Sequence, residues 1–309
     1  MSERISMNRI APTPAGRAYM TDRRFGFLLL CPGAGMIVLL FAYPIFDTLL
    51  MSLYEQDLYS VVTPFVGLEN YRQLLQSPEF WIGFKNAVIY ASITVSLQVT
   101  LGVGLALLLN LKFAGRALAR GLMLLPYVLP SVASALIWKW IYSDLLGILN
   151  DLLLRVHVLA QPVAWLARPE LAMASVIAVA VWKNAPFVVL VVLARLQTIP
   201  AEQYEAAAVD GANAWSRFWR ITLPQLHTVL MIVILLRVLW VFNEFDTIWL
   251  LTQGGPLNST LTLSILAYRK AFLEFKFSEG ITVTVCMMLF LAAVSVLYFR
   301  LYRVEKEIA

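Results

Sequence analysis

Long apolar runs alternate with short polar segments over most of this chain. Each run has at least the roughly 20 residues that an α-helix needs to cross the hydrocarbon core of a bilayer. Backbone N–H and C=O groups find no water in that core, so separate apolar runs satisfy them inside helices. The pattern therefore predicts an all-α, polytopic membrane protein with six transmembrane helices, at about residues 25–53, 86–110, 121–142, 171–196, 225–251 and 280–301.

The basic residues of the polar segments predict the orientation. Fourteen of the 24 Lys and Arg residues lie in or beside four alternate segments, namely 1–24, 111–120, 197–224 and 302–309. Lys and Arg are favoured on the cytoplasmic side of a membrane. Residues 1–24 and 302–309 are therefore predicted to be cytoplasmic tails, and the loop 197–224 is predicted to lie on the same side. The transmembrane domain is expected to cover 25–301.

Composition supports the same class and excludes others. Hydrophobic residues make up 60% of the chain and charged residues 14%, with a mean hydropathy of +0.75. A soluble domain carries roughly 25% charged residues. The net charge of +5 is spread over short loops and the termini, so no nucleic-acid partner is expected. Cys31 and Cys286 lie inside apolar runs, and the two histidines are isolated, so neither a metal site nor a catalytic site is predicted.

Glycines and prolines mark irregular positions within the predicted helices. Gly102 and Gly104 are expected to permit close helix packing in the second helix. Pro126 and Pro130 interrupt the third helix, which is tolerated at membrane depth where neighbouring helices satisfy the freed backbone groups.

The polar stretch 202–224 separates the fourth and fifth apolar runs. Pro200 suits the start of a helix, where a missing N–H is not needed. Residues 201–209 are good helix formers, and Gly211 can end a helix by taking a left-handed conformation. The stretch is thus predicted to form a short helix, a turn and a second short helix at a membrane surface.

Three patterns in this stretch, Glu205-Ala-Ala, Asp210-Gly211 and Ile221-Thr-Leu-Pro224, resemble the cytoplasmic loop of permease subunits of binding-protein-dependent ABC importers. In that family the helix of the loop docks into a cleft of the ATP-hydrolysing subunit. The alternative is an ordinary surface connection between two membrane helices. The resemblance implies that this coupling loop, 197–224, contacts the ATPase through Glu202, Tyr204, Glu205, Ala206, Ala207, Asp210 and Gly211.

Two basic residues lie midway along predicted membrane helices, Lys183 in the fourth and Arg237 in the fifth. A charge at membrane depth costs a few kcal/mol and faces a cavity or a partner. One interpretation is structural, as an ion pair or a contact with a partner permease. The other is a polar cavity for a solute, in which Asn184, Asn243 and Glu244 add hydrogen-bonding groups.

The resemblance extends to these helices. The segments 182–187 and 242–256 are similar to the fourth-helix pattern and the end of the fifth core helix in carbohydrate permeases of the maltose and glycerol-phosphate type. In maltose-type permeases, these patterns and the residue after the third helix's second proline line the sugar site. Together with the two basic residues, the predicted substrate-binding residues are Ser131, Lys183, Asn184, Phe187, Arg237, Trp240, Asn243 and Glu244. Lys183 and Glu244 are charged where the maltose-type pattern is not, so an anionic sugar is a hypothesis beside a neutral one.

The resemblance covers residues 25–301 and implies the type I ABC importer permease fold. It implies a multi-pass subunit in the bacterial plasma (inner) membrane that imports a sugar or sugar derivative by alternating access. The implied partners are a second homologous permease, an ATPase subunit dimer, an extracytoplasmic solute-binding protein, the solute and membrane lipid. ATP and Mg²⁺ would bind the ATPase, so this chain is not expected to be an enzyme or to hold a cofactor. A secondary transporter and a non-transporting membrane scaffold remain alternatives, although no internal repeat typical of secondary transporters is evident.

Overall fold

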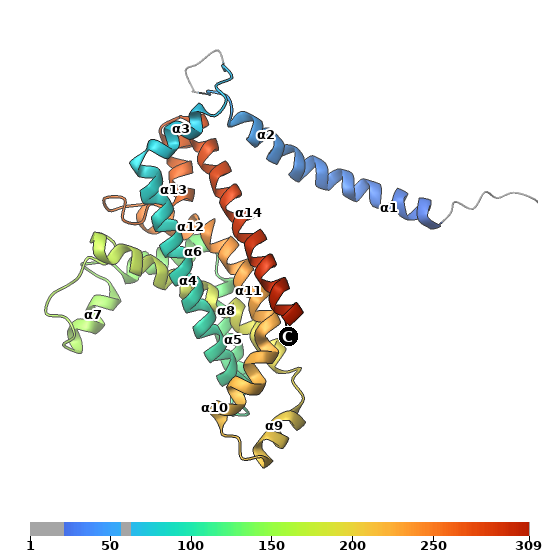
Figure 1. Ribbon diagram of the computed structural model, residues 1–309. Helices are drawn as coiled ribbons and strands as arrows, with labels where there is room; N and C mark the ends of the chain where they lie inside the picture. Colours follow the sequence, from blue (N-terminus) through green and yellow to red (C-terminus); the bar gives the residue numbers. More distant parts are fainter. Residues whose placement is uncertain (1–21, 57–62, 309) are drawn as a thin grey trace, which may run out of the picture. The chain divides into compact units, whose positions relative to one another are not determined.

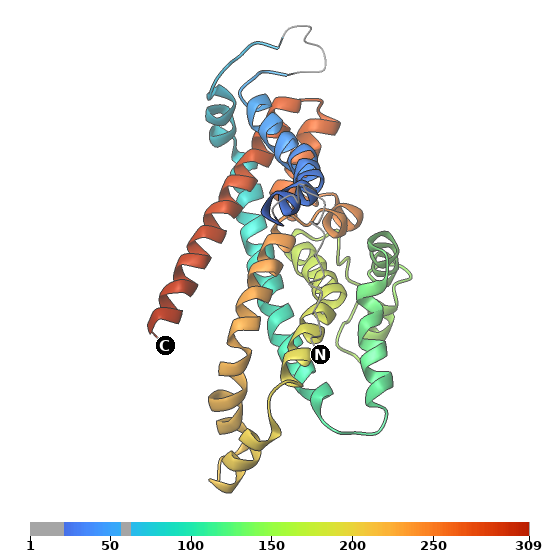
Figure 2. The same cartoon turned by 90° about the vertical axis from the view of Figure 1, so that its right-hand side faces the viewer.

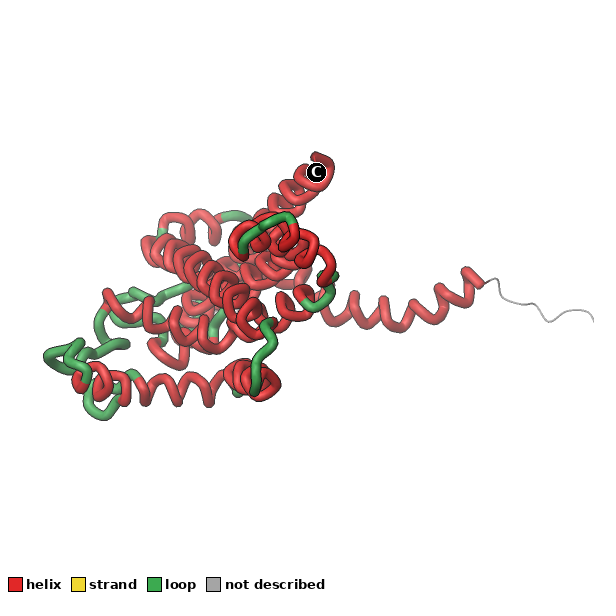
Figure 3. The backbone as a smooth tube through the Cα atoms, turned by 90° about the horizontal axis from the view of Figure 1, so that it is seen from below, coloured by secondary structure: helices red, strands yellow, loops and turns green. Residues whose placement is uncertain are grey.

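The computed structural model describes residues 22–56 and 63–308. The predicted tail 1–24 therefore lies almost entirely outside the described residues. Within them the backbone is helical or irregular, and the only strand-like pairing is a single antiparallel bridge between Tyr54 and Phe65. Figure 3 shows this predominance of helix, and the all-α class expected from the apolar runs is confirmed.

The described residues form two units, of which the first ends at Leu50 and the second begins at Met51. The first contains α1 (Asp22–Ile37), the π-helical turn η1 (Val38–Ala42) and most of α2 (Tyr43–Met51). In η1 the Tyr43 N–H donates to the Val38 carbonyl, five residues back. This wider turn lies directly before Pro44, which has no N–H for the regular helical pattern. Residues Leu29–Met51 are apolar enough to span a membrane.

The second unit holds the other candidate membrane spans. Four are α4 (Pro78–Asn110), α8 (Pro169–Leu196), the continuous run Ala214–Phe242, and Phe277–Leu301 within α14 (Phe277–Ile308). Another is the pair α5 (Arg116–Val128) and α6 (Ser131–Ile141), which meet at 97°. In the described part of the chain, five helices are thus suited to cross a membrane, or six segments when the bent pair counts as one span.

The run Ala214–Phe242 combines α10 (Ala214–Arg217), the π-helical turn η2 (Phe218–Thr222) and α11 (Leu223–Phe242). Short elements make up the rest of the unit: α3 (Glu69–Gln76), α7 (Ile148–Arg155), α9 (Ala201–Val209), α12 (Asp246–Thr252), α13 (Leu263–Tyr268) and η3 (Arg269–Leu273). Figures 1 and 2 place α3 at one end of this unit and α9 with α10 at the opposite end.

The centre of the second unit is the packing of α4 against α8. Gly102 is buried there, and a Cβ added to it would lie 2.5 Å from the Val188 Cγ1. The glycine is therefore required by the close approach of the two helices. Gly104, two residues later, faces open space. Of the two glycines predicted to permit close packing, only Gly102 has this role inside the unit.

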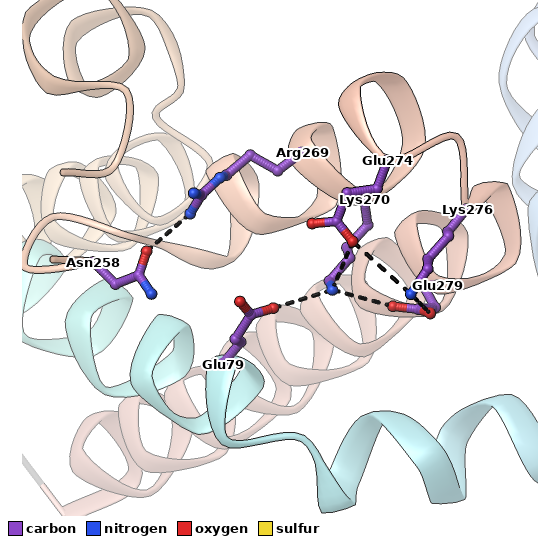
Figure 4. Close-up of polar contacts among 7 residues, drawn as sticks. All are labelled: Glu79, Asn258, Arg269, Lys270, Glu274, Lys276 and Glu279. Carbon is purple, nitrogen blue, oxygen red and sulfur yellow. Dashed lines mark hydrogen bonds and ion pairs between the residues drawn. The ribbon is translucent and has the colours of Figure 1, made fainter.

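A cluster of ion pairs ties three elements together at the end of the unit that contains α3 (Figure 4). The Lys270 Nζ lies 3.0 Å from carboxylate oxygens of Glu79 and Glu274 and 3.4 Å from Glu279. Burial by itself lowers the pKa of the Lys270 ammonium, but the hydrogen bonds to Glu274 and Glu79 outweigh it and raise the pKa above its usual range. Lys276 adds a pair with Glu279 at 3.0 Å. The cluster joins the starts of α4 and α14 to η3 and the residue that follows it.

Candidate functional site

The break between α5 and α6 brings two predicted solute-binding residues together. Leu129 has an extended backbone, as expected for a residue before proline, and Pro130 precedes the first residue of α6, Ser131. The Lys183 Nζ, from the middle of α8, donates to the Ser131 Oγ at 2.6 Å. Both residues are half-buried. The proline break therefore presents the hydroxyl at the start of a helix to a cation at membrane depth.

Three aromatic rings cluster around Phe187, one helical turn along α8 from Lys183. Phe187 follows Lys183 by one turn on the same face of α8. Its ring centroid is 6.1 Å from that of Tyr127 in α5 and 5.3 Å from that of Trp240 in α11. The Trp240 side chain is 47% exposed, and Tyr127 is exposed as well. We call Tyr127, Phe187 and Trp240 the aromatic trio; Tyr127 is a member that the sequence analysis did not single out.

Arg237 is enclosed between helices, with 3% of its surface exposed. Its Nε donates to the Gln98 Oε1 at 2.8 Å, and the Gln98 Nε2 donates to the Ala180 carbonyl at 3.0 Å. The guanidinium carbon lies 5.6 Å from the centre of the Trp240 ring, within the range of a cation–π contact. Among the described residues its hydrogen-bond partner is thus a neutral amide, and the chain Ala180–Gln98–Arg237–Trp240 crosses α8, α4 and α11.

Gln98 was missed by the sequence analysis, although a signal was present. It is the one amide between Asn86 and Asn110, and its side chain is fully buried. A buried amide must find hydrogen-bond partners, and Arg237 is the group whose charge most needs one. Whether Gln98 and Arg237 face each other depends on how α4 and α11 pack.

The remaining predicted solute residues make local hydrogen bonds. The Asn184 Nδ2 donates to the Ala180 carbonyl at 3.1 Å, and the Asn243 Nδ2 donates to the Leu239 carbonyl at 2.9 Å. One Glu244 carboxylate oxygen accepts from the Thr247 N–H at 3.1 Å and from the Thr247 Oγ1 at 2.8 Å. Glu244 therefore stabilises the start of α12, just after α11 ends at Phe242. Their predicted role as solute ligands stays a prediction.

The coupling loop has the predicted helix and turn. Pro200 precedes α9, and Gly211 follows it with a φ of 78°. Glu202, Glu205 and Ala206 are exposed on α9, whereas Ala207 is half-buried. The second short helix is not separate, because α10 continues through η2 into α11. In η2 the Leu223 N–H donates to the Phe218 carbonyl, and this wider turn accommodates Pro224.

Two contacts join α9 to the start of the next span. The Tyr204 hydroxyl lies 2.9 Å from the Thr222 Oγ1. The Gln203 side chain accepts a hydrogen bond from that of Gln225. These two contacts connect α9 to the helix that carries Arg237 and Trp240.

Comparison with known proteins decides the family. A family described as "Binding-protein-dependent transport system inner membrane component" matches residues 98–304. The "Trehalose/maltose transport system permease protein MalF" of Thermococcus litoralis is 33% identical over 286 residues, covering 93% of this chain and 96% of that one. The chain belongs to this family.

Further relatives of the permease support the same family. The "Sulfoquinovosyl glycerol transport system permease protein SmoG" of Agrobacterium fabrum is 34% identical over 285 residues, with 92% of each chain covered. The crystal structure of "a bacterial ABC transporter involved in the import of the acidic polysaccharide alginate" contains a chain with a TM-score of 0.80. The two chains are 21% identical, and the alignment covers 91% of this permease and 95% of that chain. This similarity shows the fold alone.

Several expectations are thereby confirmed. The permease is a multi-pass membrane protein with the type I ABC importer permease fold, and it belongs to the carbohydrate group that the sequence patterns indicated. The geometry thus offers hydrogen-bonding and stacking groups for a solute, together with an exposed loop helix.

Proposed function

We propose that this permease moves a sugar or sugar derivative from an extracytoplasmic solute-binding protein into the bacterial cytoplasm by alternating access. The observation that carries the proposal is the Lys183–Ser131 pair beside the aromatic trio. Relatives named for trehalose/maltose and for sulfoquinovosyl glycerol transport support a carbohydrate solute. In this proposal a partner ATPase dimer supplies the energy, and a second homologous permease completes the pathway.

The chemistry of the site fits a hydroxyl-rich solute. The Lys183 ammonium carries three donors, of which Ser131 uses one, and the Ser131 hydroxyl both donates and accepts. The Oδ1 atoms of Asn184 and Asn243 receive no donor from a described residue, so they are available as acceptors. The exposed Trp240 face supplies an apolar surface of the kind that lines small-molecule sites with few polar groups.

The charge of Lys183 favours an anionic solute over a neutral one. Its partner in the structure is a neutral hydroxyl, so the positive charge is not neutralised by that contact. A sulfonate or carboxylate on a sugar would neutralise this ammonium and accept a hydrogen bond in which both donor and acceptor are charged, whereas a sugar hydroxyl would leave the positive charge uncompensated. A neutral sugar is the second candidate, because trehalose and maltose appear in the name of one relative.

Coupling to the ATPase is proposed to use the exposed side of α9 and its turn. The residues in this role are Glu202, Tyr204, Glu205, Ala206, Ala207, Asp210 and Gly211. Closure of the ATPase dimer would move α9, and the contacts of Tyr204 and Gln203 with the start of the next span would pass the motion to α11. Trp240 would then move relative to Phe187 and change the access to Lys183.

The test uses the complex purified with its native partners in lipid nanodiscs. ATPase rate is measured with the cognate binding protein while neutral and anionic sugars are compared. We expect an anionic sugar to stimulate hydrolysis, and Lys183→Gln to raise the half-saturating solute concentration about tenfold or more, corresponding to the loss of one charge-assisted hydrogen bond.

Lys139→Gln is the matched control, because Lys139 is an exposed lysine of α6 outside the site. It should leave the half-saturating concentration unchanged. Stimulation by neutral sugars alone would refute the anionic preference. Uptake driven by an ion gradient, without any ATPase in the purified complex, would establish a secondary transporter instead.

A further inference from the structure

The helix α4 carries a file of polar side chains that starts at the buried arginine. Gln98, Thr94 and Tyr90 follow one another at intervals of four residues, so they lie on one face of the helix. Gln98 bonds to Arg237, whereas the hydroxyls of Thr94 and Tyr90 are shielded from solvent and form no hydrogen bond with a described residue. At most 1% of either residue is exposed. We call Gln98, Thr94 and Tyr90 the α4 file.

A second file, on α6, has the same form and starts at the Lys183–Ser131 pair. Ser134 and Trp138 follow Ser131 by three and seven residues, so the three side chains lie on one face. The Ser134 Oγ and the Trp138 Nε1 are shielded from solvent and have no hydrogen-bond partner within residues 22–56 and 63–308. The Trp138 ring centroid lies 5.4 Å from that of Trp182, the residue before Lys183. We call Ser131, Ser134 and Trp138 the α6 file.

The four unpartnered groups of the two files are unfavourable in the conformation that encloses them. Buried polar groups in native proteins are almost always hydrogen-bonded. Because this chain alone encloses the four atoms, a second permease could reach them only if the helices moved apart. Tyr90 belongs to the hydrophobic cluster against which Trp138 packs, so both files lie in the same part of the core.

The two files lead in the same direction from the candidate solute site. Under the proposed function, α4 begins on the extracytoplasmic side and α6 ends there. Tyr90 precedes Gln98 on α4, and Trp138 follows Ser131 on α6. Each file therefore runs from a basic residue at membrane depth toward the extracytoplasmic side. Tyr90 also interacts electrostatically with Glu244, a predicted solute-binding residue.

We propose that the two files line the extracytoplasmic half of the solute pathway, which is closed in this conformation. The inference rests on the proposed function and adds Tyr90, Thr94, Ser134 and Trp138 to the residues that contact the solute. Opening toward the binding protein would expose three hydroxyls and an indole N–H. A hydroxyl donates and accepts and an indole N–H donates, so these groups match the hydroxyls of a sugar.

Cysteine labelling of the complete complex in nanodiscs tests whether the files open. Thr94→Cys and Ser134→Cys are made in a permease that also carries Cys31→Ser and Cys286→Ser. The probe is a charged thiol reagent, and its attachment to the permease is measured by mass spectrometry. We expect labelling at both positions to be about tenfold faster or more with ATP and vanadate, which hold the ATPase dimer closed, because a minor open state then becomes the major one.

The matched control is Ala106→Cys. Ala106 is fully buried on α4, on the other side of Gln98, and packs in a separate hydrophobic cluster. It should stay unlabelled with and without nucleotide. Labelling of Ala106→Cys at the rate of the two file positions would indicate a general loosening of the helices and would overturn the proposal.

Ser131→Cys reports whether the reagent reaches the candidate solute site. If Ser131→Cys is labelled and the two file positions never are, the inference fails and the proposed function stands. If none of the three positions is labelled and solute leaves the ATPase rate unchanged, the proposed function fails and the inference fails with it.

Removal of the hydroxyls separates a pathway role from an internal water. Thr94→Val and Ser134→Ala each remove an unpartnered group with little change of shape, so the Tm should not fall. The half-saturating solute concentration for ATPase stimulation should rise about two- to tenfold, which corresponds to one neutral hydrogen bond. A lower Tm with unchanged solute dependence would assign the hydroxyls to a structural water and overturn the proposal.

Discussion

At the scale of single residues, the main feature of the interior is a buried arginine whose hydrogen-bond partner is a neutral amide. Arg237 is 3% exposed and donates to Gln98, while its charged carbon lies over the Trp240 ring. Leaving such a charge without its partner costs about 3–5 kcal/mol in buried pairs. Arg237 can therefore act as a positioning residue, in addition to making the solute contact predicted from sequence.

The first prediction concerns Gln98→Leu. This change removes the acceptor for Arg237 and leaves the guanidinium buried, so we expect a loss of about 3 kcal/mol of stability and a clear fall in Tm of the purified permease. Because Trp240 loses a fixed neighbour, the half-saturating solute concentration for ATPase stimulation should rise as well.

Gln98→Glu keeps an acceptor at the same place and should restore both quantities. Ser96→Ala, on an exposed position of the same helix, is the control and should alter neither. A Gln98→Leu permease with unchanged Tm and unchanged solute dependence would contradict the positioning role.

The second prediction concerns Gly211→Ala. Its φ of 78° is a left-handed conformation in which a Cβ costs about 1–2 kcal/mol, although no atom lies within 4 Å of that Cβ. The strain should rearrange the turn of the coupling loop, so transport should fall severalfold while membrane insertion is retained.

Solute uptake by whole cells, normalised to the amount of permease in the membrane, measures this effect. Gly104→Ala is a matched control, because that glycine also faces open space but has a helical φ. Normal uptake by the Gly211→Ala permease would show that the turn at Gly211 is not needed for coupling.

At the scale of elements, irregular helical segments place the functional groups. The break at Leu129 and Pro130 turns α6 by 97° from α5 and brings Ser131 to Lys183. The π-helical turn η2 lets the coupling loop run into α11 without a second break. Close contact at Gly102 brings α4 against α8, which allows Gln98 to reach both Ala180 and Arg237.

The third prediction concerns the ion-pair cluster that joins α4, η3 and α14. Lys270→Met removes three contacts at once and leaves three carboxylates near one another. We expect a loss of about 1.5–3 kcal/mol, the range for a hydrogen bond to a charged group, seen as a lower Tm. Arg72→Met, which breaks only the exposed pair with Glu69, should cost less than about 1 kcal/mol.

The pH dependence of this difference follows from the sign of the pKa shift. The pKa of Lys270 is raised in the folded permease, so its stabilisation is complete below the unfolded pKa of about 10.4. It is lost only as the pH rises through the higher folded value. The Tm difference between the unmodified and Lys270→Met permeases should thus stay constant from about pH 7 to pH 9. A difference that shrinks within that window would refute the assignment of the stabilisation to the ammonium.

At the scale of the whole molecule, long helices connect the two ends of the second unit. Figures 1 and 2 show α9 and α10 at the end opposite α3, and the spans α4, α8 and α11 run between these ends. The Lys183–Ser131 pair and the aromatic trio lie on these spans and on the bent pair. The TM-score of 0.80 to the alginate-transporter chain, at 21% sequence identity, shows that the fold is shared although most residues differ.

The sequence by itself determined the membrane class, the apolar runs and the form of the coupling loop. These follow from local quantities: the transfer of apolar side chains out of water and the geometry of proline and glycine. The patterns around Glu205 and Trp182 further indicated the family. All of these features are visible in contiguous stretches of chain.

Only the tertiary structure decided which groups meet. It showed that Arg237 bonds to Gln98, 139 residues away, and that Gly102 rather than Gly104 lies at the helix contact. It also showed that Glu244 stabilises the start of α12 and that Tyr127 joins Phe187 and Trp240. The rotation and spacing of packed helices determine these partnerships, and the order of residues along one helix does not contain that information.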